Sequence, residues 1–216
     1  MSSLAMPVFR AGYGQAPAWC EMDFFFIYEL VEKTTKSFII SGKKERLFIC
    51  EGKCRIINGD RQKQVKAGEI IDVRNEIGSK VELKAAESSI LIRVGGQWGD
   101  ELGNSGFFKI ENSMTPKNIG DPVEYKHKTE FDNHYHDCDE YWIIYRGKAI
   151  AVSEKIVYTI SAGDCLVTGH GHHHDMPEVL EILFGIYFET TLMGQKRRGH
   201  LWNHKNGAAR PADRRI

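Results

Sequence analysis

The feature that most constrains the fold of this 216-residue chain is an internal repeat at a constant offset of 95 residues. Three separate landmarks share this offset: Lys66-Ala67-Gly68-Glu69 with Ser161-Ala162-Gly163-Asp164, Gly52-Lys53 with Gly147-Lys148, and Glu45 with Glu140. Their agreement without a gap indicates two copies of one structural unit, which we place at residues 20–98 and 106–192. Each copy has about 80 residues, a size that is marginally stable alone, so we expect the copies to pack on each other.

Both copies consist of short apolar segments rich in Ile, Val, Phe and Tyr, bounded by glycine and polar turn residues. Such segments predict β-strands, here at 24–30, 47–57, 70–73, 89–94, 141–152, 156–160, 165–168 and 180–188. Few windows show helical periodicity. The pattern is typical of an all-β protein built as a sandwich or barrel.

Two further segments lie outside the repeat. Residues 95–106 are rich in glycine, which predicts a connector between the copies. Residues 193–216 form a basic polar tail that includes Lys196-Arg197-Arg198 and Arg214-Arg215. We expect the tail to be solvated and frayed over its last ten residues. A clamp over a site, or a contact with a partner, stays open as the alternative.

Charge composition argues against several classes of partner. Lysine and arginine number 29, aspartate and glutamate also number 29, and the formal net charge is zero. No global field attracts nucleic acid or an anionic membrane, so we expect neither as a partner. Residues 1–7 do not resemble a secretory signal, and with five cysteines this predicts reduced thiols and a cytoplasmic location.

Histidine is distributed unevenly. The first copy has none, whereas the second has seven of the nine, and His200 and His204 follow it. Residues i and i+2 of a strand project to one face, so His134 and His136 present two imidazoles side by side. Glu140 follows shortly after, and His174 comes after two turn-permitting glycines. These residues are candidates for one metal site.

These residues resemble the two motifs of the cupin superfamily. In the first, His-x-His is followed by three or four residues, Glu, six residues and Gly, which is matched by His134, His136, Glu140 and Gly147. The second runs Gly, five residues, Pro-x-Gly, two residues, His, three residues and Asn, and is matched by Gly163, Gly171 and His174. It departs from the family at Gly169, which replaces proline, and at Glu178, which replaces asparagine.

The resemblance implies two double-stranded β-helix, or jelly-roll, barrels in tandem, which is the bicupin arrangement. It also implies one divalent transition metal in the C-terminal barrel, held by His134, His136, Glu140 and His174. The offset maps these four onto Ile39, Ser41, Glu45 and Ser79. Only the carboxylate is kept, so we expect an N-terminal barrel without metal ligands, in which Glu45 is a surface or salt-bridging residue.

Three imidazoles and one carboxylate suit Fe, Mn, Ni, Co or Zn and do not select among them. Along the strand from Glu140, Trp142 and Arg146 project with the ligand and are candidates for substrate binding, unless a bulge reverses them. His172 would share a face with His174 and, with Glu178, is a candidate for acid/base catalysis. Cys138 is an extra soft ligand, a redox-sensitive thiol or a plain loop residue. His200 and His204 would share a helix face, but their flanks are loop-like.

The favoured function is a metal-dependent enzyme acting on a small oxygenated organic molecule, such as a sugar derivative or a keto or enol acid. The reaction is either dioxygen-dependent oxidation, as in a dioxygenase, or isomerisation or elimination through a metal-bound enolate. The alternative is a non-catalytic bicupin that binds a metal or a carbohydrate; a seed-storage role fits poorly with a complete ligand set. We expect a small-molecule substrate and a monomer or homodimer.

Overall fold

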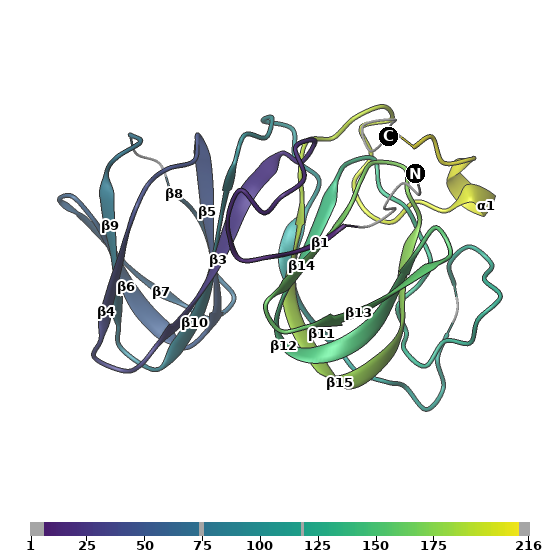
Figure 1. Cartoon of the computed structure of the whole chain (residues 1–216), viewed down its shortest axis with the longest axis horizontal. Coiled ribbons are helices and arrows are strands. Elements are labelled where there is room, and N and C mark those ends of the chain that lie inside the picture. The colour runs from purple at the N-terminus through teal and green to yellow at the C-terminus, as the bar shows by residue number, and fades with distance from the viewer. Residues whose placement is uncertain (1–6, 74–75, 118, 212–216) are drawn as a thin grey trace. The chain divides into compact units, whose positions relative to one another are not determined.

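The computed structural model describes residues 7–73, 76–117 and 119–211, and apart from one short helix its regular secondary structure consists of strands. It divides into two compact units (Figure 1). One comprises residues 11–98, and the other comprises the described residues up to Arg10 together with those from Gly99 onward. The all-β prediction is therefore confirmed. Among the described residues no helix has the length and apolar character needed to cross a membrane.

The N-terminal unit contains two sheets. The five-stranded sheet has the order β2 (Gly12–Tyr13), β3 (Met22–Leu30), β10 (Ser89–Gly96), β5 (Lys44–Glu51) and β8 (Ile70–Val73). The four-stranded sheet has the order β4 (Thr35–Ile39), β9 (Lys80–Ala85), β6 (Lys53–Asn58) and β7 (Arg61–Lys66). Side chains from both sheets, such as Leu47 of β5 and Leu83 of β9, form one buried cluster.

The C-terminal unit is organised around one six-stranded sheet. Its order is β1 (Val8–Arg10), β14 (Asp164–Thr168), β12 (Glu140–Ser153), β15 (His174–Glu189) and β11 (Ser105–Ile110), with β13 (Ile156–Ser161) also paired to β12. The long strands β12 and β15 shift register several times, which lets them curve around a core that includes Trp142, Met176 and Leu183. In the part of the chain that the structure describes, one short helix, α1 (Asn203–Asn206), follows the sheet.

Strand pairing repeats at the offset found in the sequence. Glu45 pairs with Val73 between β5 and β8, and Glu140 pairs with Thr168 between β12 and β14. Likewise β6–β7 and β12–β13 have the same register. The offset does not hold at one position. Ile39 and His134 are equivalent by the offset, but Ile39 pairs with Lys80 and His134 bridges to His174, and these two partners are not separated by 95 residues. By this pairing the N-terminal counterpart of His174 is Lys80, not Ser79.

Several expectations about local structure need correction. The expected strand 47–57 is two strands, because Gly52 adopts a positive φ of 72° between β5 and β6. Strands β4, β7 and β9 were missed because their exposed positions carry lysine, arginine, threonine and glutamine, which weaken the apolar signal. Gly95 and Gly96 belong to β10 instead of a connector. A Cβ at Gly95 would collide with the ring of Phe24, so close packing explains the glycine.

The tail prediction is also wrong for its first half. Leu201 is buried and forms an antiparallel bridge with Tyr135, so this segment packs on the C-terminal unit. His200 precedes α1, and therefore His200 and His204 do not share a helix face. Residues 1–6 of the N-terminal segment, and Arg214 and Arg215 of the tail, lie outside the described residues.

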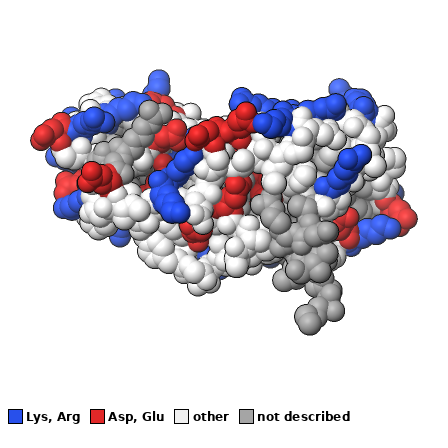
Figure 2. Space-filling view, turned by 90° about the horizontal axis from the view of Figure 1, so that it is seen from above, with Lys and Arg blue, Asp and Glu red and all other residues white. Residues whose placement is uncertain are grey.

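Surface charge is mixed on the face seen in Figure 2. Lysine and arginine side chains stand among aspartate and glutamate on that face. Several charged side chains of the described residues form exposed ion pairs, such as Lys109 with Glu111 in the C-terminal unit and Lys80 with Glu82 in the N-terminal unit. This distribution agrees with the formal net charge of zero.

Candidate metal centre

The C-terminal unit brings the four residues predicted as metal ligands together. His134 and His136 lie on the segment that leads into β12, Glu140 is the first residue of β12, and His174 is the first residue of β15. The bridge between His134 and His174 joins the two chain segments. One potential ligand atom from each residue lies within 4.8 Å of the others, and all four residues are buried.

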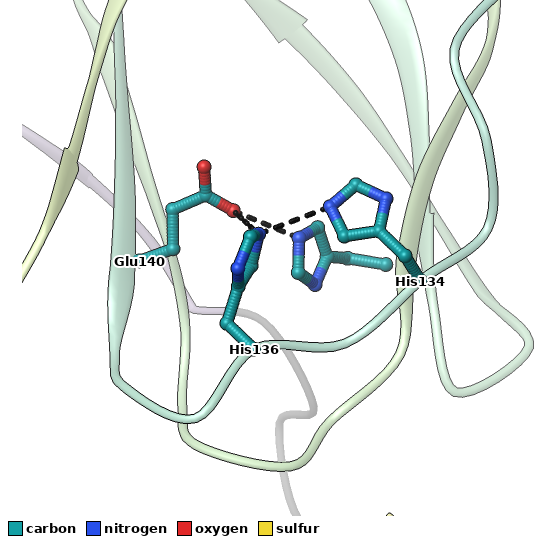
Figure 3. A group of neighbouring side chains, drawn as sticks. His134, His136 and Glu140 are labelled. Carbon is teal, nitrogen blue, oxygen red and sulfur yellow. Dashed lines mark hydrogen bonds and ion pairs between the residues drawn. The ribbon is translucent and has the colours of Figure 1, made fainter. Parts of the chain in front are cut away.

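The four side chains converge through their terminal atoms. Figure 3 shows His134, His136 and Glu140 pointing toward one another from different parts of the backbone. The Nε2 atoms of His134 and His136 are 3.0 Å apart. Oε2 of Glu140 lies 3.2 Å from Nε2 of His136 and 2.8 Å from Nε2 of His174. The centre is therefore lined by three imidazole nitrogens and one carboxylate oxygen.

Backbone carbonyl groups fix the tautomer of each imidazole. The carbonyl oxygens of Asp132, Gly199 and His172 lie 2.7, 3.1 and 3.1 Å from the Nδ1 atoms of His134, His136 and His174, respectively. A carbonyl oxygen only accepts hydrogen bonds, so each Nδ1 carries the hydrogen and each neutral Nε2 presents a lone pair.

When all three imidazoles are neutral, acceptors therefore face one another without a donor between them. In the neutral state the three Nε2 lone pairs and the Glu140 carboxylate repel each other unless a cation or protons lie among them. Nε2 of His174 and Oε2 of Glu140 are also buried without a hydrogen-bond partner. A divalent metal ion bound by nitrogen and oxygen satisfies all four atoms, so the residues present fit such an ion.

Electrostatics favour positive charge at the centre, which a proton on His136 supplies when no metal ion is bound. Burial and the neighbouring His174 lower the pKa of His134 well below its ordinary value, and burial also lowers the pKa of His174. Burial acts to lower the pKa of His136 too, but the Glu140 carboxylate outweighs it and raises that pKa to about 9. Burial acts to raise the pKa of Glu140, yet His136 and His174 hold it well below its ordinary value. Glu140 is therefore ionised.

Asp132, which the sequence reasoning did not single out, and His200, which it considered only together with His204 on a helix, both contact His134. The ring of His200 stacks on that of His134, with ring centroids 3.6 Å apart and planes at 5°. Asp132 accepts hydrogen bonds from Nδ1 of His200 and Nε1 of Trp202, at 3.1 and 2.6 Å. The available signals were the carboxylate two residues before His134 and the aromatic His200-Leu201-Trp202 run in an otherwise polar tail.

The two residues predicted to bind substrate differ in position. Trp142 is buried, and its ring centroid lies 5.3 Å from that of His174, so it forms a wall of the centre. Arg146 is exposed. The expectation that Arg146 projects inward is wrong, because the β12–β15 register shifts between Ile144 and Arg146 and breaks the alternation that starts at Glu140.

The two residues predicted as acid/base catalysts lie beside the ligands instead of among them. His172 precedes β15, and its Nδ1 is 3.8 Å from Oε1 of Glu154. Glu178 lies on β15 four residues after His174, and its carboxylate is paired with Nζ of Lys128 at 2.6 Å. In the described contacts, neither the Glu178 carboxylate nor the His172 imidazole reaches the Nε2 atoms of the histidines in the four-residue cluster.

Cys138 and Glu189 form a second layer next to His136. Oε1 of Glu189 lies 3.9 Å from Nδ1 of His136, and Oε2 lies 4.0 Å from Sγ of Cys138. Burial raises the pKa of the Cys138 thiol, and nearby carboxylates raise it further. A thiol that stays protonated is a poor metal ligand, so the four-residue set is favoured over a set that includes Cys138.

Comparison with known proteins identifies one close relative in sequence. The chain is 38% identical over 214 residues to the uncharacterized protein y4oW of Sinorhizobium fredii, across 99% of this chain and 98% of the relative. No protein-family model matches the chain.

Solved structures of cupin-domain proteins resemble the chain in fold. An oxalate decarboxylase of Bacillus subtilis superposes with a TM-score of 0.57 at 9% identity, covering 82% of this chain and 70% of that one. The vicilin of hazelnut, Corylus avellana, gives 0.55 at 10% identity, covering 78% and 74%. A Cupin 2 conserved barrel domain protein from Leptotrichia buccalis gives 0.43 at 11% identity, covering 88% and 91%. The decarboxylase and vicilin superpositions support a cupin fold.

Proposed function

This chain belongs to the same family as the uncharacterized protein y4oW and has a cupin fold, and we propose that it is a metal-dependent enzyme acting on a small oxygenated organic molecule. The proposal includes two jelly-roll barrels in tandem, with the metal in the C-terminal one. One observation carries it: three imidazoles with Nδ1 committed to backbone carbonyls direct their Nε2 atoms, with a buried carboxylate, at one point.

His134, His136, Glu140 and His174 would hold the ion. Manganese is the first metal to test, because the oxalate decarboxylase of Bacillus subtilis has Mn(II) centres. When bound, a divalent ion supplies Lewis-acid polarisation of a substrate oxygen and, for a redox-active metal, reactivity toward dioxygen. The single carboxylate would offset half the charge of a divalent ion, which leaves the centre cationic and attractive to an oxygen-rich ligand.

The protein itself would supply orientation and a shielded environment. The rings of Phe131 and Trp142 lie 5.1 Å apart, and both contact ligand imidazoles, so they form an apolar wall that limits water. A cavity of about 600 Å³ reaches Phe131, Asp132 and His200, which all contact His134. Lys109, Asn112, Ser113 and Glu130 also line it, which suits a small polar molecule such as a sugar derivative or a keto or enol acid.

Two reaction classes agree with this arrangement: dioxygen-dependent oxidation, and isomerisation or elimination. The second needs a residue that moves a proton. His172 is the better candidate of the two from the sequence, because it adjoins the ligand His174, whereas Glu178 is paired with Lys128.

A non-catalytic binding role is the second candidate, and the burial of the site favours it. The side chains of His134 and His174 are each 1% exposed, and that of Glu140 is 6% exposed. A centre this enclosed suits retention of an ion or ligand as well as turnover.

Elemental analysis joined to an activity screen tests the proposal. We expect one equivalent of a divalent metal in the wild-type protein and none in His134→Ala. Oxygen uptake with a panel of sugars and keto acids, lost in the same variant, would assign the oxidation branch. Turnover without oxygen uptake would assign isomerase or lyase chemistry, and bound metal without turnover would favour the binding role. A wild-type protein that binds no divalent metal would overturn the proposal.

A further inference from the structure

We infer that the C-terminal segment Gly199–Trp202 is an integral part of the metal centre, positioning His136 and His134 and thereby setting metal affinity. This inference rests on the proposed metal-dependent function. It concerns positioning residues: His200 also lies within a second group of possible ligands, with Asp132 and His134, but none of the segment's side chains belongs to the four-residue set.

The segment pairs with the backbone between the first two ligands. The amide of Tyr135 donates to the carbonyl of Leu201 at 3.0 Å, and the amide of Leu201 donates to the carbonyl of Tyr135 at 3.0 Å. Tyr135 separates His134 from His136, so the pairing holds the backbone from which both imidazoles project. Leu201 is 3% exposed, which anchors the segment by burial.

One backbone atom of the segment contacts a ligand directly. The carbonyl oxygen of Gly199 accepts the hydrogen of His136 Nδ1 at 3.1 Å, which leaves Nε2 of His136 free to bind a metal. Gly199 has a positive φ of 90°, a conformation that other residues adopt only with strain. A Cβ at this position would meet open space, so the glycine serves backbone geometry and not packing.

The next residues hold the other imidazole from two sides. His200 stacks flat on His134, while its Nδ1 lies 3.1 Å from Oδ1 of Asp132. Trp202 donates to Oδ2 of the same carboxylate at 2.6 Å. The backbone carbonyl of Asp132 in turn accepts from Nδ1 of His134 at 2.7 Å. Asp132 therefore connects the segment to His134.

The residues that precede this segment are held in place as well. Asp137, which follows His136, accepts hydrogen bonds from the amides of Gln195 and Arg197 at 3.2 and 3.1 Å. These hydrogen bonds hold the residues that precede Gly199 against the segment that bears His134 and His136. Contacts of this kind act on orientation, and groups that orient a ligand typically change metal affinity by about 10–100-fold.

The experiment measures affinity for Zn(II) and the visible absorption of bound Co(II) in the full-length chain. The variants are Leu201→Pro, which removes the amide that donates to Tyr135, and His200→Ala, whose side chain is 43% exposed and therefore removable without unfolding. His204→Ala is the control, because its imidazole bonds Asp121 outside the four-residue cluster. Unfolding of each metal-free variant by denaturant is followed in parallel.

We expect Zn(II) affinity to fall about 10–100-fold in Leu201→Pro and less in His200→Ala, with a changed Co(II) spectrum in both. The control should stay within about twofold of wild type. Unchanged affinity and spectra in folded His200→Ala and Leu201→Pro would overturn the inference while leaving the proposed function intact. If Leu201→Pro does not fold, His200→Ala decides alone. A wild-type chain that binds neither ion would overturn both proposals.

Discussion

Glu45 and Glu140 stand at equivalent positions of the two units, and each is buried, but they face different partners. In the C-terminal unit, Glu140 meets the imidazoles of His136 and His174. In the N-terminal unit, Glu45 receives a two-point ion pair from the buried Arg93, with Nε and Nη2 donating at 2.8 and 2.7 Å. Of the two roles expected for Glu45, the salt-bridging one is confirmed, and the surface one is wrong because the residue is buried beside Arg93 of β10.

Arg93 also reaches the positions that correspond to the missing ligands. Its Nη2 donates to the carbonyl of Ile39 at 2.8 Å and lies 3.2 Å from Oγ of Ser41. The offset equates Ile39 and Ser41 with His134 and His136. The guanidinium additionally lies 4.0 Å from the ring centroid of Phe38. A buried carboxylate at this position therefore takes a fixed organic cation in one unit and an arrangement suited to a metal cation in the other.

Removing imidazoles from the C-terminal centre should have the largest effect. We expect His134→Ala/His174→Ala to lose metal affinity by more than about 100-fold, because even a partner outside the ligand set changes it by about 10–100-fold. Glu45→Gln should retain the wild-type stoichiometry. Metal content by mass spectrometry distinguishes the two variants. Metal kept by the double variant, or lost from Glu45→Gln, would contradict the assignment of the metal to the C-terminal unit alone.

Removing Arg93, the cation of the buried ion pair in the N-terminal unit, should have the next largest effect. Arg93→Met leaves the Glu45 charge buried and is expected to destabilise the protein by about 3–5 kcal/mol. Arg93→Met/Glu45→Gln removes both charges and should be clearly more stable than Arg93→Met. Denaturant unfolding gives both free energies. If the double variant is less stable than Arg93→Met, then Arg93 does not stabilise the protein by compensating the buried charge of Glu45.

Metal binding in the C-terminal centre should strengthen with pH. In the metal-free protein the pKa of His136 is raised to about 9, so its stabilising charge is fully present below pH 6.5 and is lost as pH rises through about 9. A metal ion must displace that proton, and we expect affinity to rise about tenfold per pH unit between pH 6.5 and 9. Calorimetric titration at several pH values checks this, and a flat profile would contradict a protonated His136.

The comparison also explains what could be predicted from sequence. The cluster of His134, His136, Glu140 and His174 could be predicted because the spacing between chemically distinctive residues is visible in the sequence. The observed pairings of β5 with β8 and of β12 with β14 agree with the same offset. Arg93 was not found, because one arginine in an apolar strand carries no sign of the partner that folding places beside it. The Gly199 carbonyl is invisible for a similar reason, since its contribution is a backbone atom.

Glycines at the repeated turn should show that the two units share backbone geometry. Gly52 and Gly147 have positive φ values of 72° and 88°, and a Cβ would collide with the carbonyls of Ser88 and Ile182, respectively. We expect Gly52→Ala and Gly147→Ala each to cost about 2 kcal/mol. Gly68→Ala, where φ is 90° but the space is open, should cost about 1 kcal/mol. Unequal costs at Gly52 and Gly147 in thermal unfolding would argue against equivalent turns.

The smallest effect is expected for an ion pair that lacks burial. Lys128 and Glu178 are 2.6 Å apart, like Arg93 and Glu45 at 2.7 Å, but their side chains are 56% and 33% exposed instead of 2% and 0%. Water solvates each partner when the other is removed, so Glu178→Gln should change the unfolding free energy by less than about 1 kcal/mol. Zn(II) affinity should stay within about twofold of wild type. A larger loss of stability would mean that the short distance, and not burial, determines what an ion pair contributes. A loss of affinity would bring Glu178 into the metal centre.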